Sequence, residues 1–395
     1  MYLQNKHSFS RNIPLDILRF VAVLLVIGRH FQLPSKDCAV WLQPVFYAWI
    51  RGGWVGVDLF FVLSGFLISG LLFNDYKKNR SLSLGRFYIR RGFKIYPAFY
   101  FFIITTCFIS LFYFYLKITK KGLLGESIFI QNYLGGIWPH TWSLAIEEHF
   151  YFLLPIVLLF LVKRNRSSSD PFRPILNITL FVVIICLLLR ILTAHFRDYE
   201  QLSSQAATHL RIDSLIFGVA VSYFYNFHRA SFEKFASQYR YILLGAALLL
   251  LSPAFIFQLE TTPFIYTIGL TLFFLGGASL LCAIVSANIP VNILTRFLGY
   301  VGSHSYSIYL WHIPTIFWFS PLIQRRIFFG KLSYTFASIL SVLLSFGFGI
   351  FFARIIEFPV LKMRDKFFPS VNKPPVNPTV IKDEGSFPVT DSVQN

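Results

Sequence analysis

LDILRFVAVLLVIGRHF, residues 15–31, has the apolar content of a membrane-spanning helix, yet it contains Asp16, Arg19, Arg29 and His30. A charge inside a bilayer costs several kcal/mol and is retained mainly where it has a function. Arg19 and His30 are eleven residues apart. Eleven residues of α-helix turn through about 1100° and rise about 16 Å, so both side chains fall on one face. The stretch therefore predicts a spanning helix that presents a permanent cation and a titratable imidazole on the same face.

The composition of the whole chain is that of a membrane protein. Of its 395 residues, 55% are hydrophobic and 14% are charged, whereas soluble domains have about 25% charged residues. The net charge of +18 would suggest nucleic-acid binding in a soluble protein. The positive-inside rule accounts for it here, so we expect no nucleic-acid partner. The four cysteines have neither metal-site nor disulfide spacing, and the sequence predicts no metal site.

Apolar runs long enough to cross a bilayer recur along the chain. They predict an all-α polytopic membrane protein with about ten transmembrane helices. If the N-terminus is cytoplasmic, most Lys and Arg residues fall on inner segments, so both termini are predicted to be cytoplasmic. The expected regions are a cytoplasmic N-terminus (1–13), a transmembrane domain (14–360) and a polar, disordered cytoplasmic tail (361–395). The predicted spans are 14–33, 54–73, 95–116, 138–162, 175–194, 211–227, 241–258, 264–286, 298–319 and 334–356.

The second predicted span begins GGWVGVD, residues 52–58. Small residues let helices approach closely, and this packing role is the expected one for Gly56 and Gly65. Asp58 is a carboxylate about one turn into the helix. It either caps the helix N-terminus or faces a polar cavity.

The segment RFYIRRGFKIYP, residues 86–97, is rich in cations and precedes the third predicted span. One interpretation is a topological anchor that also contacts lipid phosphate. The other is a phosphate-binding surface on the cytoplasmic side, formed by Arg90, Arg91 and Lys94.

The fourth predicted span includes WSLAIEEHFY, residues 142–151. Acidic residues near a helix N-terminus suit the macrodipole, and this structural account fits Glu148 or His149 better than a buried Glu147. The predicted topology places His30, Asp58 and Glu147 near the outer ends of their helices. A histidine beside a carboxylate is the arrangement that a general base needs.

Further charged residues favour structural interpretations. Arg211 and Asp213 open the sixth predicted span and are expected to neutralise each other. Arg354 and Glu357, three residues apart, are expected to form an intrahelical pair. His312 lies beside Trp311 and is more typical of a packing residue than of a catalyst.

In their order along the chain, these motifs resemble the acyltransferase 3 family of bacterial integral-membrane O-acyltransferases, over roughly residues 14–360. Lys94 departs from the family's second Arg in an Arg-x-x-Arg motif, and His149 stands where Gln is common. The esterase-like domain fused in some relatives is absent, so a stand-alone form is expected. The matching segments are Arg19 with His30, Gly53–Phe66, Trp142–Leu144 with Glu147, Phe150, Tyr151 and Pro155, Arg211 with Asp213 and Gly218, Ser305–Tyr306, Tyr309–His312, and Arg354 with Glu357 and Pro359.

The resemblance implies transfer of an acyl group, usually acetyl, from cytoplasmic acetyl-CoA to a hydroxyl of a surface glycan such as lipopolysaccharide O-antigen. The location would be the bacterial inner membrane, with membrane lipid and a glycan or glycolipid acceptor as partners. We expect Arg90, Arg91 and Lys94 to hold the CoA phosphates. Arg19 would guide the pantetheine arm or polarise the thioester. His30, supported by Glu147 or Asp58, would deprotonate the acceptor or carry the acyl group itself.

Two other classes of protein compete with this interpretation. A secondary transporter of a small anion or acyl donor would also contain intramembrane charges, although the two halves of the chain show no internal repeat. A membrane scaffold that binds partners through its tail leaves Arg19 and His30 unexplained.

Overall fold

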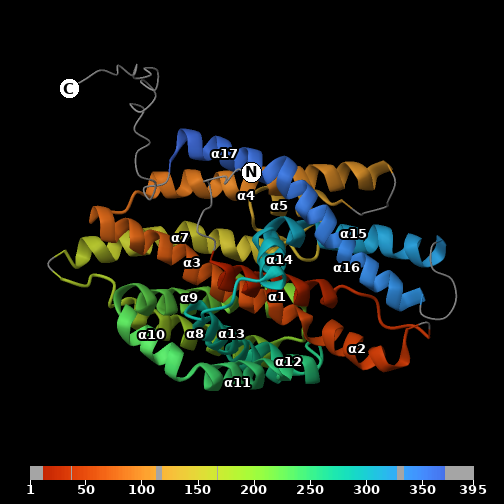
Figure 1. Cartoon of the computed structure of the whole chain (residues 1–395), viewed down its shortest axis with the longest axis horizontal. Coiled ribbons are helices and arrows are strands. Elements are labelled where there is room, and N and C mark those ends of the chain that lie inside the picture. Colours follow the sequence, from red (N-terminus) through yellow and green to blue (C-terminus); the bar gives the residue numbers. More distant parts are fainter. Residues whose placement is uncertain (1–11, 37, 113–117, 167, 327–332, 370–395) are drawn as a thin grey trace, which may run out of the picture.

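The computed structural model describes residues 12–36, 38–112, 118–166, 168–326 and 333–369. Within these ranges the regular structure is helical and includes no strand, which confirms the all-α prediction (Figure 1). The helices are α1 (Ile13–Arg29), α2 (Gln43–Gly52), α3 (Gly56–Asn79), α4 (Leu84–Phe112), α5 (Lys120–Ser127), α6 (Gln131–Leu134), α7 (Trp142–Arg164), α8 (Ile175–Phe196), α9 (Thr208–Phe227), α10 (Arg229–Gln238), α11 (Arg240–Leu251), α12 (Pro253–Ile256), α13 (Leu270–Val285), α14 (Ile293–Ser303), α15 (Ser305–Arg326), α16 (Ser333–Phe352) and α17 (Phe358–Phe367).

Among the described residues, six helical segments are long and apolar enough to cross a membrane. A seventh is possible if the bent pair Arg229–Gln238 and Arg240–Ile256, with a 75° bend, counts as one span. The chain is therefore a multi-pass membrane protein. The six segments are Val40–Asn79, Leu84–Phe112, Trp142–Arg164, Ile175–Phe196, Ile265–Val285 and Tyr334–Phe367.

Three of the predicted spans fall on helices that do not meet these criteria. The span 14–33 corresponds to α1, which has 17 residues, and 211–227 corresponds to α9, which is not among the six segments. The span 298–319 is divided between α14 and α15. The ten-helix count and the cytoplasmic termini therefore remain predictions.

Helix α1 lies at the centre of the bundle (Figure 1). It begins after Asn12, whose side chain accepts a hydrogen bond from the Leu15 amide, and it ends at Arg29, with His30 as the C-cap residue. It packs against α2, α3, α13, α14 and α15. Polar side chains on α1 can therefore reach several other helices.

Close contacts between helices depend on small residues, as predicted for the second span. A Cβ at Gly56 would overlap the Ala22 carbonyl oxygen of α1. A Cβ at Gly65 would overlap the Leu215 carbonyl oxygen of α9. The packing role expected for both glycines is confirmed, and it fixes α3 between α1 and α9.

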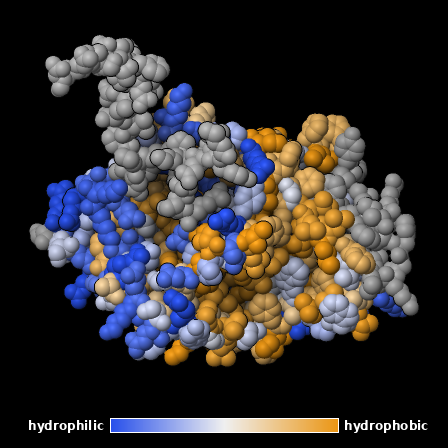
Figure 2. Space-filling model, in the orientation of Figure 1, coloured by the Kyte–Doolittle hydropathy of each residue, from blue (hydrophilic) through white to orange (hydrophobic). Residues whose placement is uncertain are grey.

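The polar ends of the helices gather at one end of the molecule. Figure 2 shows hydrophilic side chains at this end and hydrophobic ones over much of the rest of the same face. The predicted tail begins at 361, and α17 continues past this boundary to Phe367. Residues 370–395 of that tail lie outside the described residues.

Candidate active site

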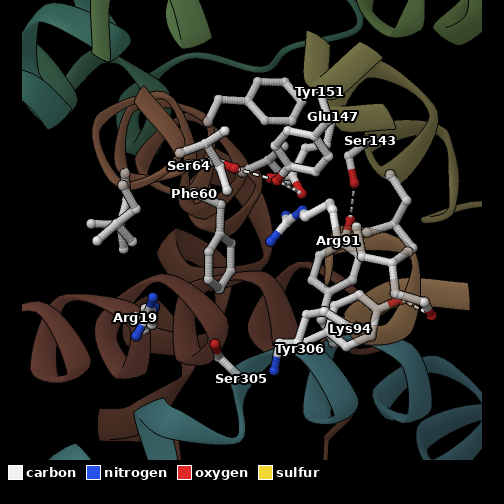
Figure 3. Close-up of a pocket in the computed structure, with 18 of the residues that line it drawn as sticks. Arg19, Phe60, Ser64, Arg91, Lys94, Ser143, Glu147, Tyr151, Ser305 and Tyr306 are labelled. Carbon is white, nitrogen blue, oxygen red and sulfur yellow. Dashed lines mark hydrogen bonds between the residues drawn. The ribbon is translucent and has the colours of Figure 1, made fainter. Parts of the chain in front are cut away.

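A cavity of about 390 Å³ opens between α1, α3, α4, α7 and α15 (Figure 3). Three of the predicted cations and one predicted carboxylate line it together, which no single motif could indicate. Its polar lining consists of Arg19, Ser64, Arg91, Lys94, Ser143, Glu147, Tyr151, Ser303, Ser305, Tyr306 and Tyr309.

Arg91 is held over an aromatic ring at one wall of this cavity. Its guanidinium carbon lies 3.8 Å from the centroid of the Tyr151 ring, a cation–π contact. The Tyr151 hydroxyl donates to Glu147 Oε2 at 2.8 Å and is also hydrogen-bonded to Ser64 (Figure 3). Glu147 thus belongs to the cationic cavity and stabilises Arg91 electrostatically.

Lys94 is paired with Glu357, whose other oxygen accepts from Ser307 Oγ at 2.8 Å. The predicted intrahelical pair between Arg354 and Glu357 was therefore wrong. These residues lie in a π-helical segment, Ala353–Glu357, in which the wider turn changes the directions of neighbouring side chains. Arg354 Nη2 instead donates to the Tyr300 hydroxyl at 2.6 Å.

Arg19 and His30 do lie on one face of α1, as their spacing predicts. Arg19 forms an ion pair with Asp16 and lines the cavity beside Ser305, at the start of α15. His30 contacts His312, which lies further along α15. Both side chains therefore face α15.

The imidazole rings of His30, His312 and His140 lie close together behind one wall of the cavity. The His30 and His312 ring centroids are 5.1 Å apart, and those of His312 and His140 are 5.0 Å apart. The sequence gave His312 a packing role and did not single out His140. The adjacent Thr-Trp-Ser segment was the available signal for His140, because it places this histidine at the entrance of a predicted span.

Backbone carbonyls determine which nitrogen of each buried histidine carries the proton. His312 Nδ1 lies 2.6 Å from the Tyr309 carbonyl oxygen, and His140 Nε2 lies 3.2 Å from that of Leu310. A carbonyl only accepts, so each of these nitrogens is protonated. His312 Nε2 and His140 Nδ1 then carry lone pairs, and neither has a hydrogen-bond partner among the described residues.

Tyr309 and Ser143 form the wall between the cavity and the histidines. The Tyr309 hydroxyl is 2.6 Å from Ser143 Oγ and donates to the His140 carbonyl oxygen at 2.9 Å. The Tyr309 ring lies 5.4 Å from that of His140 and 5.5 Å from that of His312. Tyr309 is thus in contact with the histidines on one side and lines the cavity on the other.

Asp58 does not cap the helix, so that interpretation was wrong, and it does not line this cavity. Its Oδ1 accepts from Arg211 Nη2 at 2.8 Å, and both side chains are fully buried. Asp213 pairs with Arg190 at 2.8 Å, also fully buried. Arg211 and Asp213 therefore pair with other helices and not with each other, because residues two apart on a helix do not face one another.

The predicted acid–base layer of His30, Asp58 and Glu147 does not form as one group. Glu147 is hydrogen-bonded to Tyr151, Asp58 is paired with Arg211, and His30 contacts His312. Helix α7 begins at Trp142, so Glu147 lies in its second turn and points toward the cations of the cavity. Within the described residues, no group of His, Cys, Asp or Glu has the arrangement of a metal site.

An acyltransferase domain model matches residues 12–354. The chain belongs to the acyltransferase 3 family. The family model covers α1 and the histidine cluster as well as all the helices that line the cavity. The resemblance deduced from the motifs is thus confirmed.

Curated relatives of this family member are O-acetyltransferases by name. Peptidoglycan O-acetyltransferase OatA of Listeria monocytogenes is 29% identical over 339 residues, which are 78% of this chain and 50% of that protein. Putative peptidoglycan O-acetyltransferase YrhL of Bacillus subtilis is 30% identical, covering 82% of this chain and 51% of the relative. O-acetyltransferase OatA of Staphylococcus aureus is 29% identical, and the match covers 90% of this chain and 58% of the relative. The chain thus spans about half the length of these relatives, and no solved structure matches it.

Proposed function

We propose that this protein is a membrane O-acyltransferase that moves an acetyl group from cytoplasmic acetyl-CoA to a hydroxyl of a cell-envelope glycan. One observation carries the proposal: a cation-lined cavity is separated from a histidine cluster by Tyr309 and Ser143. The cations suit the phosphates of the donor, and the histidines suit proton transfer from the acceptor. The O-acetyltransferase names of the relatives support the same chemistry.

On the donor side, the cavity would receive the pantetheine arm. Arg91 and Lys94 lie at its junction with a second cationic cavity, lined by Arg86 and Arg90, where the phosphates would bind. Lys94 is already neutralised by Glu357, so Arg91 is the stronger electrostatic contributor of the two. Arg19, close to the other lining residues, would contact the arm or the thioester carbonyl.

On the acceptor side, His30 would take the proton of the attacking hydroxyl. The hydroxyl oxygen then bonds to the thioester carbon, the carbon–sulfur bond breaks, and the leaving sulfur takes up the proton from the imidazolium. If His30 instead carries the acyl group first, its nitrogen bonds to the thioester carbon, the carbon–sulfur bond breaks, and the sulfur takes up the imidazole proton. The hydroxyl oxygen then bonds to the acyl carbon, the carbon–nitrogen bond breaks, and the hydroxyl proton returns to His30. In both routes His312 is the neighbouring base.

The acceptor that we propose is a hydroxyl-bearing glycan of the envelope. Peptidoglycan is the acceptor class in the names of two relatives, and lipopolysaccharide O-antigen is the acceptor implied by the resemblance. Both present secondary or primary alcohols of sugars, so one base can serve either. We propose the inner membrane, with both chain termini on the cytoplasmic side, as the location.

The decisive experiment uses the purified protein in liposomes with acetyl-CoA labelled in the acetyl group. Peptidoglycan fragments and lipopolysaccharide are supplied as separate acceptors. Label on either glycan, dependent on the protein, supports the proposed function and selects the acceptor. Label that crosses the membrane as intact acetyl-CoA, with neither glycan modified, would show a transporter and overturn the proposal.

A further inference from the structure

A second cavity, of about 190 Å³, adjoins the first and is more strongly cationic. The two share the lining residues Ile68, Leu71, Arg91 and Lys94, so these four side chains lie where the cavities meet. Among the described residues that line the second cavity, Asp75 is the only acidic one. That carboxylate is already engaged by Asn79 and by the Ser83 amide. The five cationic lining residues are Arg86, Arg90, Arg91, Lys94 and Arg364.

Helix α17 supplies one of these cations. It packs against α4, beside which it lies in Figure 1. Arg364 on α17 lines the cavity opposite the cations of α4. The family match ends at residue 354, so this helix lies beyond the conserved domain model. Arg364 also falls in the segment for which the sequence predicted a disordered tail.

The same helix supplies the anion that holds the cluster together. Asp365 Oδ1 accepts from Arg90 Nη2 at 3.1 Å and from Arg364 Nη2 at 2.9 Å. Arg90 also donates to the Phe368 carbonyl oxygen. The charges of Arg86 and Arg364 repel Arg90, and that of Asp365 attracts it. One carboxylate thus balances three guanidinium groups only in part.

Such a cationic cluster can bind the anionic oxygens of a ligand. Guanidinium groups form forked, charge-assisted hydrogen bonds with phosphate as readily as with carboxylate. The Asp365 carboxylate engages Arg90 and Arg364 through one oxygen, whereas a phosphate group has enough acceptor oxygens to offer a separate one to each. Its additional charge can also reach Arg86.

We propose that α17 completes a phosphate-binding site in this second cavity. Arg364, with Arg86 and Arg90, binds phosphate groups, and Asp365 is the internal anion that these groups displace. The proposal rests on the proposed function for the identity of the ligand, the nucleotide part of coenzyme A. The phosphates then sit in the second cavity, and the arm extends past Arg91 into the larger cavity.

Binding of coenzyme A to the purified full-length protein, measured by titration calorimetry, tests this site. Arg364→Ala removes charge-assisted hydrogen bonds and is expected to weaken binding about 10- to 100-fold. Arg364→Lys keeps the charge without the fork and should recover part of the affinity. Asp365→Asn removes the competing anion and should tighten binding several-fold, a gain that misfolding cannot produce. The matched control is Lys366→Ala, since Lys366 is an exposed cation on the same helix and does not line the cavity.

Two further titrations distinguish the kinds of phosphate ligand that the site could bind. Inorganic pyrophosphate and a soluble short-chain phosphatidylglycerol are titrated into the same variants. If Arg364→Ala changes only the affinity for phosphatidylglycerol, the site binds lipid headgroups and the nucleotide assignment is overturned. If pyrophosphate shows the expected dependence but coenzyme A does not bind, the anion site stands and the proposed donor is wrong.

A third result would reject the role of α17 in phosphate binding and leave the proposed function intact. In that case coenzyme A binds, labelled acetyl reaches a glycan, and Arg364→Ala and Asp365→Asn leave the affinity unchanged in proteins with unaltered thermal unfolding.

Discussion

His30 and His312 face each other across the α1–α15 contact, with ring centroids 5.1 Å apart. The Tyr309 carbonyl oxygen fixes the His312 tautomer, leaving Nε2 as a base without a partner among the described residues. A histidine–carboxylate pair was the expectation, yet the structure gives a histidine–histidine pair. The imidazole of His312 is therefore a base beside the His30 ring.

The first prediction concerns this pair. His30→Ala should lower acetyl transfer by about 10²- to 10⁴-fold, the usual contribution of a general base. His312→Gln can still donate to the Tyr309 carbonyl but lacks the basic nitrogen, so we expect a lower kcat with an unchanged KM for acetyl-CoA. Initial rates of labelled transfer measure both effects. His195→Gln, at an exposed histidine of α8, is the control; a wild-type kcat for His312→Gln would reject the pair.

The second prediction concerns Asp58, which the structure pairs with Arg211. Asp58→Asn leaves Arg211 as an unpaired charge in a fully buried position. Breaking one partner of a buried pair costs about 3–5 kcal/mol of stability. We therefore expect a large fall in thermal unfolding temperature in detergent, with lost activity in proportion to lost folded protein.

A double variant separates this structural role from a catalytic one. Asp58→Asn combined with Arg211→Met removes both charges and should recover much of the unfolding temperature and of the activity. A double variant that folds as the wild type does but transfers no acetyl would show that Asp58 takes part in the reaction.

The sequence predicted faces of helices better than it predicted partners. The eleven-residue spacing correctly placed Arg19 and His30 on one side of α1, because helical rotation is a local property. The partner of Asp58 is Arg211, which is 153 positions away, and no spacing rule reaches that far. Lys94 and Glu357 are likewise paired across 263 positions. Arg211 and Asp213 were predicted to form an ion pair because they are close in sequence. Tertiary packing, however, decides which helix each side chain meets.

The third prediction is a pH dependence that originates at Glu126, in the short helix α5 outside the candidate spans. Its Oε1 accepts hydrogen bonds from Thr141 Oγ1 at 2.7 Å and from the Ile137 amide at 3.0 Å, which hold the turn that carries His140. Burial raises the pKa of Glu126 from 4.5 to about 7, and these hydrogen bonds oppose the shift only in part.

When a carboxyl has a higher pKa in the folded state than in the unfolded state, its ionisation lowers the stability of the folded protein. The stability should therefore fall as the pH rises from about 4.5 to about 7, by about 3 kcal/mol in total, and stay constant above. Glu126→Gln should remove this fall and make the protein more stable than the wild type at pH 8. Thermal unfolding between pH 5 and pH 8 measures it, with the exposed Glu200→Gln as control. Equal pH slopes for wild type and Glu126→Gln would contradict the assignment.

The last prediction tests the close contact between α3 and α9. Alanine favours a helix over glycine by about 1 kcal/mol, so Gly→Ala is stabilising where the added methyl group has room. At Gly70 the nearest atom to such a methyl group would be Ser222 Oγ, at 3.4 Å, an ordinary contact. At Gly65 the methyl group would overlap the backbone of Leu215 and push the two helices apart, at a cost of about 1–3 kcal/mol. Gly70→Ala should thus raise the thermal unfolding temperature slightly and Gly65→Ala should lower it. A Gly65→Ala variant at least as stable as the wild type would contradict the close approach of α3 to Leu215.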